Sequence, residues 1–227
     1  MTRETLDRKL HELLDEILVL GSMVEDAILG SVDALKRRDI EESRKIHEAD
    51  KQINKRRFQI ENDTIILIAT QQPMATDLRL LASILEVASE LERMGDYAKG
   101  IALINIRMGD APLVKPLIDV PRMSEITVDM LHRALSAFVE SDGQAARLIP
   151  KEDDVVDALY NQVYRELLTY MIADPSTIDN ATYLLWVAHN LERTADRVTN
   201  ICERTIFVDT GELVEIKASD DDEQDYH

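Results

Sequence analysis

The sequence predicts an all-α protein made of two tandem three-helix bundles. The chain has only seven Gly and six Pro among 227 residues and is 4% aromatic, a composition that favours helices over strands. Apolar residues recur at steps of three, four and seven positions, which is the period of amphipathic helices. The second half of the chain also repeats features of the first half. Six long helices arising from an internal duplication are therefore expected.

The first predicted helix follows a single apolar stripe. Its members recur at helical spacing and indicate about eight turns: Leu6, Leu10, Leu13, Ile17, Leu20, Val24, Ile28 and Leu35. A short connection near residue 39 predicts an antiparallel second helix over 41–71, which ends before Pro73 because the residue preceding proline disfavours helical angles. A third helix begins near Thr76 and Asp77, whose side chains are expected to cap it.

Residues 109–121 hold three prolines and break the helical pattern, so they are predicted to form a linker. The pattern then restarts with helices expected over 122–141, 151–173 and 177–208. Pro175 separates the last two of these helices, and Gly211 ends the final one.

The predicted domains follow from these boundaries. They are a first bundle over residues 1–108, a second bundle over 122–210 and an acidic, disordered tail over 211–227. Whether the two bundles lie side by side or end to end stays open.

The internal repeat is visible at individual residues. At an offset of 103 positions, Asp26, Asp39 and Asp50 match Asp129, Asp142 and Asp153. Near the end of each unit the offset falls to 100, so that Glu92 and Asp96 match Glu192 and Asp196. Two copies of one three-helix unit account for this pattern.

Charge and composition exclude several classes of protein. The chain has 44 acidic and 26 basic residues, a formal net charge of −18, and such a surface repels nucleic acid. The single cysteine, Cys202, cannot form an internal disulfide, which is typical of a reducing compartment. No apolar run approaches the roughly 20 residues that span a bilayer. We therefore expect a soluble, cytoplasmic protein.

The candidate functional residues are pairs of acids at helical spacing. Glu192 and Asp196 lie four positions apart on one face of a helix, where like charges repel. Glu92 and Asp96 repeat this arrangement in the first unit. In the second helix of each unit, Asp50 and Asp153 open a further pair of oxygen-bearing residues at the same spacing.

If the second and third helices pack antiparallel, these pairs meet and provide oxygen ligands that suit hard metal ions. The predicted metal ligands are Asp153, Asp157, Glu192, Asp196 and Asn200 in the second unit, and Asp50, Glu92 and Asp96 in the first. For a single such pair, a solvated acidic face paired with Arg93 or Arg193 would be the ordinary interpretation. The occurrence of two matching copies favours metal sites.

The first copy departs from the second. Asn54 stands where the second unit has Asp157, and Gly100 stands where it has Asn200. Lys99 lies one turn beyond Asp96 and is placed to offset its charge. Metal is therefore expected chiefly in the second unit. His189 precedes Glu192 by three positions, but it is interpreted as a histidine at the edge of the bundle.

These residues resemble those of the PhoU family, the accessory regulators of bacterial phosphate transport. The matching features are the two tandem units, the Leu-Glu-Arg motifs at 91–93 and 191–193, and Asp50 and Asp153 opening the second-helix motifs. The resemblance implies clusters of divalent or trivalent metal ions such as Fe, Mn, Mg or Zn. It also implies negative regulation of phosphate uptake and of the phosphate-starvation response. The implied partners are the phosphate transporter ATPase and the sensor histidine kinase. Homodimers, attached to the membrane only through those partners, are expected.

Two alternatives remain open at this point. One is a metal-dependent enzyme built on the bundle carboxylates, and the other is a metal-free helical scaffold. The sequence contains no Gly-rich phosphate loop, serine elbow or Cys-x-x-Cys motif, so no catalytic residues are assigned and a non-enzymatic protein is predicted.

Overall fold

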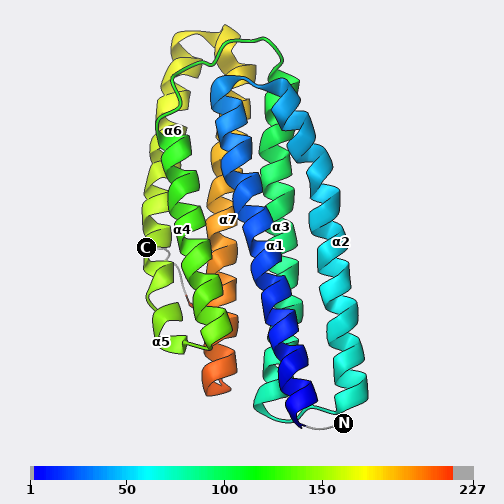
Figure 1. Cartoon of the computed structure of the whole chain (residues 1–227). Helices are drawn as coiled ribbons and strands as arrows, with labels where there is room; N and C mark the ends of the chain where they lie inside the picture. Colours follow the sequence, from blue (N-terminus) through cyan, green and yellow to red (C-terminus); the bar gives the residue numbers. More distant parts are fainter. Residues whose placement is uncertain (1–2, 217–227) are drawn as a thin grey trace, which may run out of the picture.

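A computed structural model describes residues 3–216 of the chain and contains six long helices (Figure 1). The long helices are α1 (Arg3–Arg37), α2 (Ile40–Gln71), α3 (Thr76–Met108), α4 (Asp119–Glu140), α6 (Asp153–Ala173) and α7 (Ile178–Thr210). Between them lie the short helix α5 (Gly143–Ala146) and the 3₁₀ turns η1 (Ile149–Glu152) and η2 (Pro175–Thr177). Residues 3–216 contain no strand, and the predicted all-α fold is confirmed. Of the predicted disordered tail over 211–227, residues 217–227 lie outside the described residues.

Some details of the helix ends differ from the sequence prediction. The fourth helix begins at Asp119, inside the predicted linker, because Pro121 occupies the first turn, where a missing N–H costs nothing. The predicted cap of the third helix is wrong. The residue at the cap position is Ala75, with φ 49° and no capping side chain, and Thr76 Oγ1 instead accepts a hydrogen bond from Arg79 Nη2 (3.1 Å).

The corner after the first helix of each unit repeats the same backbone hydrogen bond. The N–H of Asp39 donates to the carbonyl of Ala34 and that of Asp142 to the carbonyl of Ala137, both at 2.8 Å. Each Asp side chain then accepts from the N–H groups that open the next helix. These four residues are related by the offset of 103, so the internal duplication is present in three dimensions.

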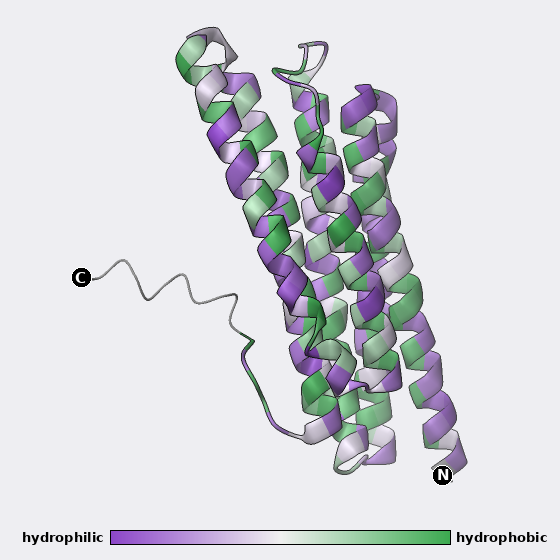
Figure 2. Cartoon of the chain, turned by 90° about the vertical axis from the view of Figure 1, so that its left-hand side faces the viewer, coloured by the Kyte–Doolittle hydropathy of each residue, from purple (hydrophilic) through white to green (hydrophobic). Residues whose placement is uncertain are grey.

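The two bundles lie side by side and run nearly the full length of the molecule (Figure 1). α3 and α7 form the most extensive helix pair and run antiparallel, and α1 packs on α4. α2 and α6 lie on the outer flanks. Gly21 of α1 permits a close approach, since a Cβ there would lie 2.2 Å from Leu135 Cδ1 of α4. Each helix shows alternating hydrophilic and hydrophobic sides (Figure 2), and the buried apolar residues form one continuous core.

The contacts between α3 and α7 follow the internal repeat. Asn200 of α7 donates a hydrogen bond to Glu90 of α3. The equivalent positions, Asn190 and Gly100, also meet, because a Cβ on Gly100 would lie 2.9 Å from Asn190 Nδ2. The two units therefore face each other about an approximate two-fold axis. No helix within residues 3–216 combines the length and the apolar character needed to cross a membrane.

Candidate metal centre

The second unit gathers four acids, Asp153 and Asp157 of α6 with Glu192 and Asp196 of α7, here called the second cluster. Asp153 is the first residue of α6 and is buried, with 3% of its surface exposed. Asp153 Oδ1 and Glu192 Oε2 are both buried without a hydrogen-bond partner among the described residues. Buried carboxylate oxygens without partners are costly, so this cluster is electrostatically incomplete.

Three acids of the second cluster, Asp153, Asp157 and Glu192, have pKa values above those of free carboxyl groups. Burial, followed by repulsion from Asp157, raises the pKa of Asp153 to about 7. Burial, followed by repulsion from Asp196, also raises the pKa of Glu192 to about 7. The pKa of Asp157 is raised for the same two reasons. A cation placed among these groups would relieve both the desolvation and the repulsion.

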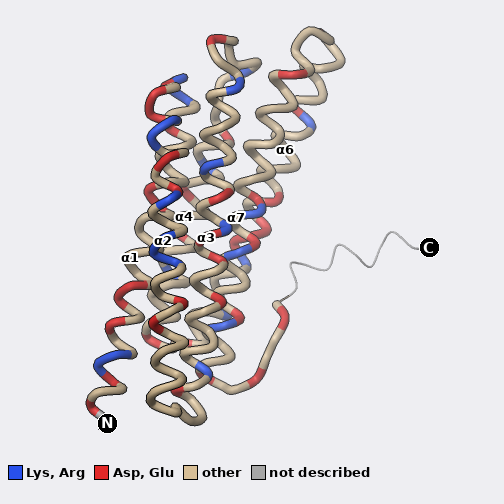
Figure 3. Tube along the Cα trace, turned by 90° about the vertical axis from the view of Figure 1, so that its right-hand side faces the viewer, with Lys and Arg blue, Asp and Glu red and all other residues tan. Residues whose placement is uncertain are grey.

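A hollow of about 300 Å³ lies beside the second cluster. Its lining residues come from α6, α7 and the coil after α7: Asp153, Asp196, Arg197, Thr199, Asn200, Glu203, Glu215 and Ile216. The N–H of Ile216 donates to Glu203 Oε1 (2.7 Å), so the coil is held against α7. Acidic residues mark this coil in Figure 3. Glu215 and Ile216, which fall within the predicted tail, therefore border the hollow.

Asn200 lines the hollow, but its amide group is directed toward the first unit. Asn200 Nδ2 donates to Glu90 Oε2 of α3 (3.1 Å). Arg197 Nη1 contacts the same oxygen at 3.4 Å. The amide N–H₂ of Asn200 is thus engaged between the two units rather than among the four acids.

The first unit places Asp50, Asn54, Glu92 and Asp96, here called the first cluster, at the equivalent positions. Lys99 Nζ lies 2.8 Å from Asp50 Oδ2 and 3.3 Å from Asp96 Oδ1. Asn54 Nδ2 also donates to Asp50 Oδ2 (3.0 Å). The expectation that Lys99 offsets the charge of Asp96 is confirmed, and the same ammonium group also neutralises the buried Asp50.

The residue equivalent to Lys99 in the second unit is Thr199. Its hydroxyl oxygen is buried and has no hydrogen-bond partner among the described residues. The second cluster therefore lacks the internal lysine that the first cluster has. Its cationic neighbour is Arg193, with Nη1 3.0 Å from Asp196 Oδ2 and Nε 3.6 Å from Glu192 Oε2. Thr199 was not among the predicted site residues, although the offset of 100 positions would have revealed it. Glu90 and Arg197 were also missed, because their contact depends on the register between α3 and α7.

The chemistry of the second cluster fits a hard cation, since Asp153 Oδ1 and Glu192 Oε2 are buried and accept no hydrogen bond from the described residues. As the side chains are arranged, no three His, Cys, Asp or Glu groups within residues 3–216 converge closely enough to hold a metal ion. Binding there would require side-chain rotation. His189 lies at the edge, with Nδ1 3.6 Å from Glu192 Oε2 and its ring beside Tyr160 and Trp186.

The fold and the paired acid clusters define a class of duplicated helical-bundle proteins with one carboxylate-rich position in each unit. The model of the PhoU domain matches residues 17–104 and 120–205, and the chain belongs to the PhoU family.

Similar proteins span nearly the whole chain. A phosphate-specific transport system accessory protein PhoU homolog from Aquifex aeolicus is 35% identical over 92% of this chain and 95% of its own length. The homolog from Clostridium acetobutylicum is 36% identical over 95% and 99%. The crystal structure of the phosphate transport system regulatory protein PhoU from Streptococcus pneumoniae has a TM-score of 0.86 and 33% identity, covering 93% of this chain and all of that one.

Proposed function

We propose that this protein is a non-enzymatic negative regulator of phosphate uptake and of the phosphate-starvation response. The observation that carries the proposal is the match of both units, over nearly the whole chain, to phosphate-specific transport system accessory proteins. The protein acts by binding, on the cytoplasmic side of the membrane, to the transporter ATPase and to the sensor histidine kinase. It works as a homodimer.

Metal binding at the second cluster is part of this proposal. Asp153, Asp157, Glu192 and Asp196 hold one or more divalent or trivalent ions, such as Fe, Mn, Mg or Zn, and Asn200 lies beside them. The support is the pair of buried carboxylate oxygens without partners and the raised pKa values of three of the acids. The bound ion fixes the relation between α6 and α7, so that the partners meet one defined surface.

Deletion of the gene tests the regulatory role. In phosphate-rich medium, the deletion strain should express phosphate-scavenging genes that the parent strain represses, and the intact gene supplied in trans should restore repression. Affinity purification of the tagged protein should recover the transporter ATPase or the sensor kinase. A deletion strain with normal repression, together with recovery of neither partner, would rule the proposal out.

A further inference from the structure

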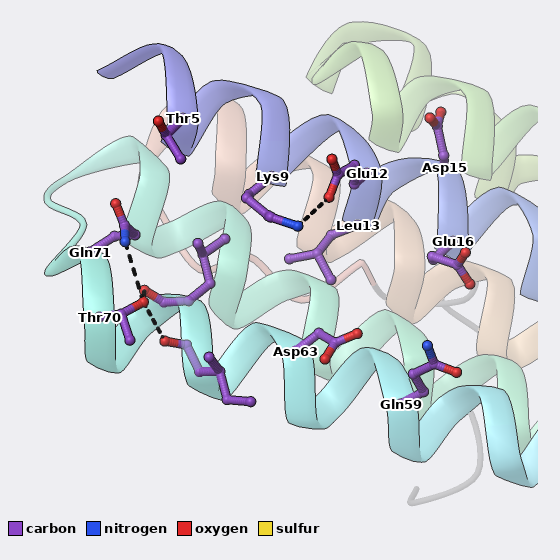
Figure 4. Close-up of a pocket in the computed structure, with 12 residues that line it drawn as sticks. Thr5, Lys9, Glu12, Leu13, Asp15, Glu16, Gln59, Asp63, Thr70 and Gln71 are labelled. Carbon is purple, nitrogen blue, oxygen red and sulfur yellow. Dashed lines mark hydrogen bonds and ion pairs between the residues drawn. The ribbon is translucent and has the colours of Figure 1, made fainter. Parts of the chain in front are cut away.

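A long groove lies between the first half of α1 and the second half of α2, and none of its lining residues belongs to either cluster (Figure 4). Its volume is about 650 Å³. Its lining residues include four acids and one lysine: Glu12, Asp15, Glu16, Asp63 and Lys9. Leu13, Ile66 and Leu67 supply apolar surface. These residues define the α1–α2 groove, which is negatively charged over an apolar base.

The charges of the α1–α2 groove are only partly balanced. Lys9 pairs with Glu12 (2.6 Å), and Arg56 pairs with Glu16. Asp63 is exposed and forms no ion pair within residues 3–216. Gln59 lies one turn before it, and both side chains face α1 across the groove (Figure 4). The α2 wall therefore presents an unpaired carboxylate beside an amide.

The equivalent surface of the second unit, on α6, is occupied by another part of the chain. At the offset of 103, Gln59 and Asp63 of α2 correspond to Gln162 and Glu166 of α6. There the linker inserts Lys115, which is 9% exposed and forms an ion pair with Glu166. Lys115 Nζ also lies 3.5 Å from Asp119 Oδ2. The acid that stays unpaired on α2 is thus neutralised on α6 by a lysine from an extended segment.

The segment around Lys115 combines one positive charge with apolar neighbours. Leu117 is buried, and Leu113 and Val114 pack against the core. Two prolines, Pro112 and Pro116, keep this stretch out of a helix. In the first unit, helical residues of α1 take the place of this extended segment. They cover the face of α2 only partly.

We infer that the α1–α2 groove docks an extended segment of a partner protein that carries a Lys or Arg between apolar residues. The basic group pairs with Asp63, and the apolar side chains cover Leu13, Ile66 and Leu67. The tail of the chain itself is a poor occupant, since residues 218–227 carry five acids and no Lys or Arg. The inference concerns the groove alone and holds whether or not the protein regulates phosphate uptake.

A synthetic peptide taken from the linker is a direct probe. The peptide APLVKPLI, residues 111–118, is labelled with a fluorophore and titrated with the full-length protein while anisotropy is recorded. Saturable binding is expected. Changing the peptide by Lys115→Glu should weaken binding at least about tenfold, since like charges then meet in the groove. The protein variant Asp63→Lys should weaken binding of the original peptide by a similar factor.

The variant Glu48→Lys is the matched control. Glu48 is an exposed acid on α2 that does not line the groove, so this variant has the same change in net charge and should bind the peptide as the parent does. Circular dichroism establishes that each variant is folded. A photo-crosslinker in place of Leu113 of the peptide should label residues 5–16 or 59–71.

Four results would overturn the inference. They are the absence of binding, equal binding of the Lys and Glu peptides, equal losses in Asp63→Lys and Glu48→Lys, and crosslinks confined to α6, where the peptide would merely replace the linker. Sedimentation of the protein alone provides one more test. A dimer that Asp63→Lys separates into monomers would assign the groove to a second copy of the chain and not to a partner protein.

Discussion

The first and second clusters share one backbone plan but balance their charges differently. In the first cluster, Lys99 lies 2.8 Å from the buried Asp50, and the protein itself supplies the cation. In the second, Thr199 occupies the position of Lys99, so no lysine reaches the buried Asp153, although one oxygen of each of these two buried acids has no hydrogen-bond partner among the described residues. A buried carboxylate without a cation is costly, by several kcal/mol in typical cases. One position per unit therefore decides whether a lysine of the chain neutralises the buried acid of the cluster.

The largest expected effect comes from removing the acids of α7. The double variant Glu192→Ala/Asp196→Ala should lose bound metal entirely, because two of the four acids of the second cluster disappear. The equivalent variant Glu92→Ala/Asp96→Ala should lose little metal, because Lys99 already neutralises acids of the first cluster. Elemental analysis of the purified proteins measures both. Equal losses from the two variants, or no metal in the parent protein, would contradict the contrast between the clusters.

A lysine introduced at position 199 should give the second cluster the charge arrangement of the first. In Thr199→Lys the new ammonium group can reach Asp153 and Asp196, as Lys99 reaches Asp50 and Asp96. Metal affinity should fall at least about tenfold, and the metal-free protein should gain about 1–3 kcal/mol from the new buried ion pair. Metal titration and chemical unfolding measure the two effects. Thr199→Met is the control for side-chain length, and a similar stabilisation there would show that packing, and not charge, distinguishes the clusters.

The metal-free protein should lose stability as the pH rises through about 7. Asp153 and Glu192 have pKa values of about 7 in the folded protein, above those of an unfolded chain. Between the unfolded and folded pKa values the folded state binds more protons, so the free energy of unfolding falls as the pH rises. The free energy of unfolding should fall by on the order of a few kcal/mol between about pH 4 and about pH 7.

Thermal unfolding after chelation, recorded across that range, measures this dependence. The variant Asp153→Asn should flatten it, because the amide neither ionises nor repels its neighbours. An unchanged slope in Asp153→Asn would assign the pH dependence to other groups.

The smallest effect is expected from removing the residues that follow the coil bordering the hollow. A chain ending at Ile216 keeps the hydrogen bond to Glu203 and should bind metal and repress phosphate-scavenging genes as the full chain does. A chain ending at Gly211 loses that contact and should bind metal more weakly. The metal content of the two truncated proteins distinguishes the coil from the acidic residues that follow it.

The helices were predictable because each carries a long apolar stripe, and the stripes of the two units repeat. Short features escaped prediction. α5 and η1 are too short to show a helical period. Ala75 adopts a positive φ, which its residue type does not predict. Pro121 was interpreted as part of a linker although it lies in the first turn of α4.

The acid pairs of the candidate site were visible from spacing, and so was Lys99 beside them. The contact between Glu90 and Asn200 was not, because it joins residues 110 positions apart and depends on how two helices align. No periodicity within either helix fixes that alignment.

The approximate two-fold axis between α3 and α7 has a consequence for how such a chain holds together. In a symmetric pair of separate subunits, each contact occurs twice and the assembly dissociates on dilution. Here the two symmetric units are joined by the linker. The faces of α1 and α3 that pack on α4 and α7 are therefore always buried within one molecule. The chain is in effect a fused dimer, whose halves stay associated at any concentration. Because they are encoded separately, the two halves are also free to diverge, as position 99 and position 199 have done.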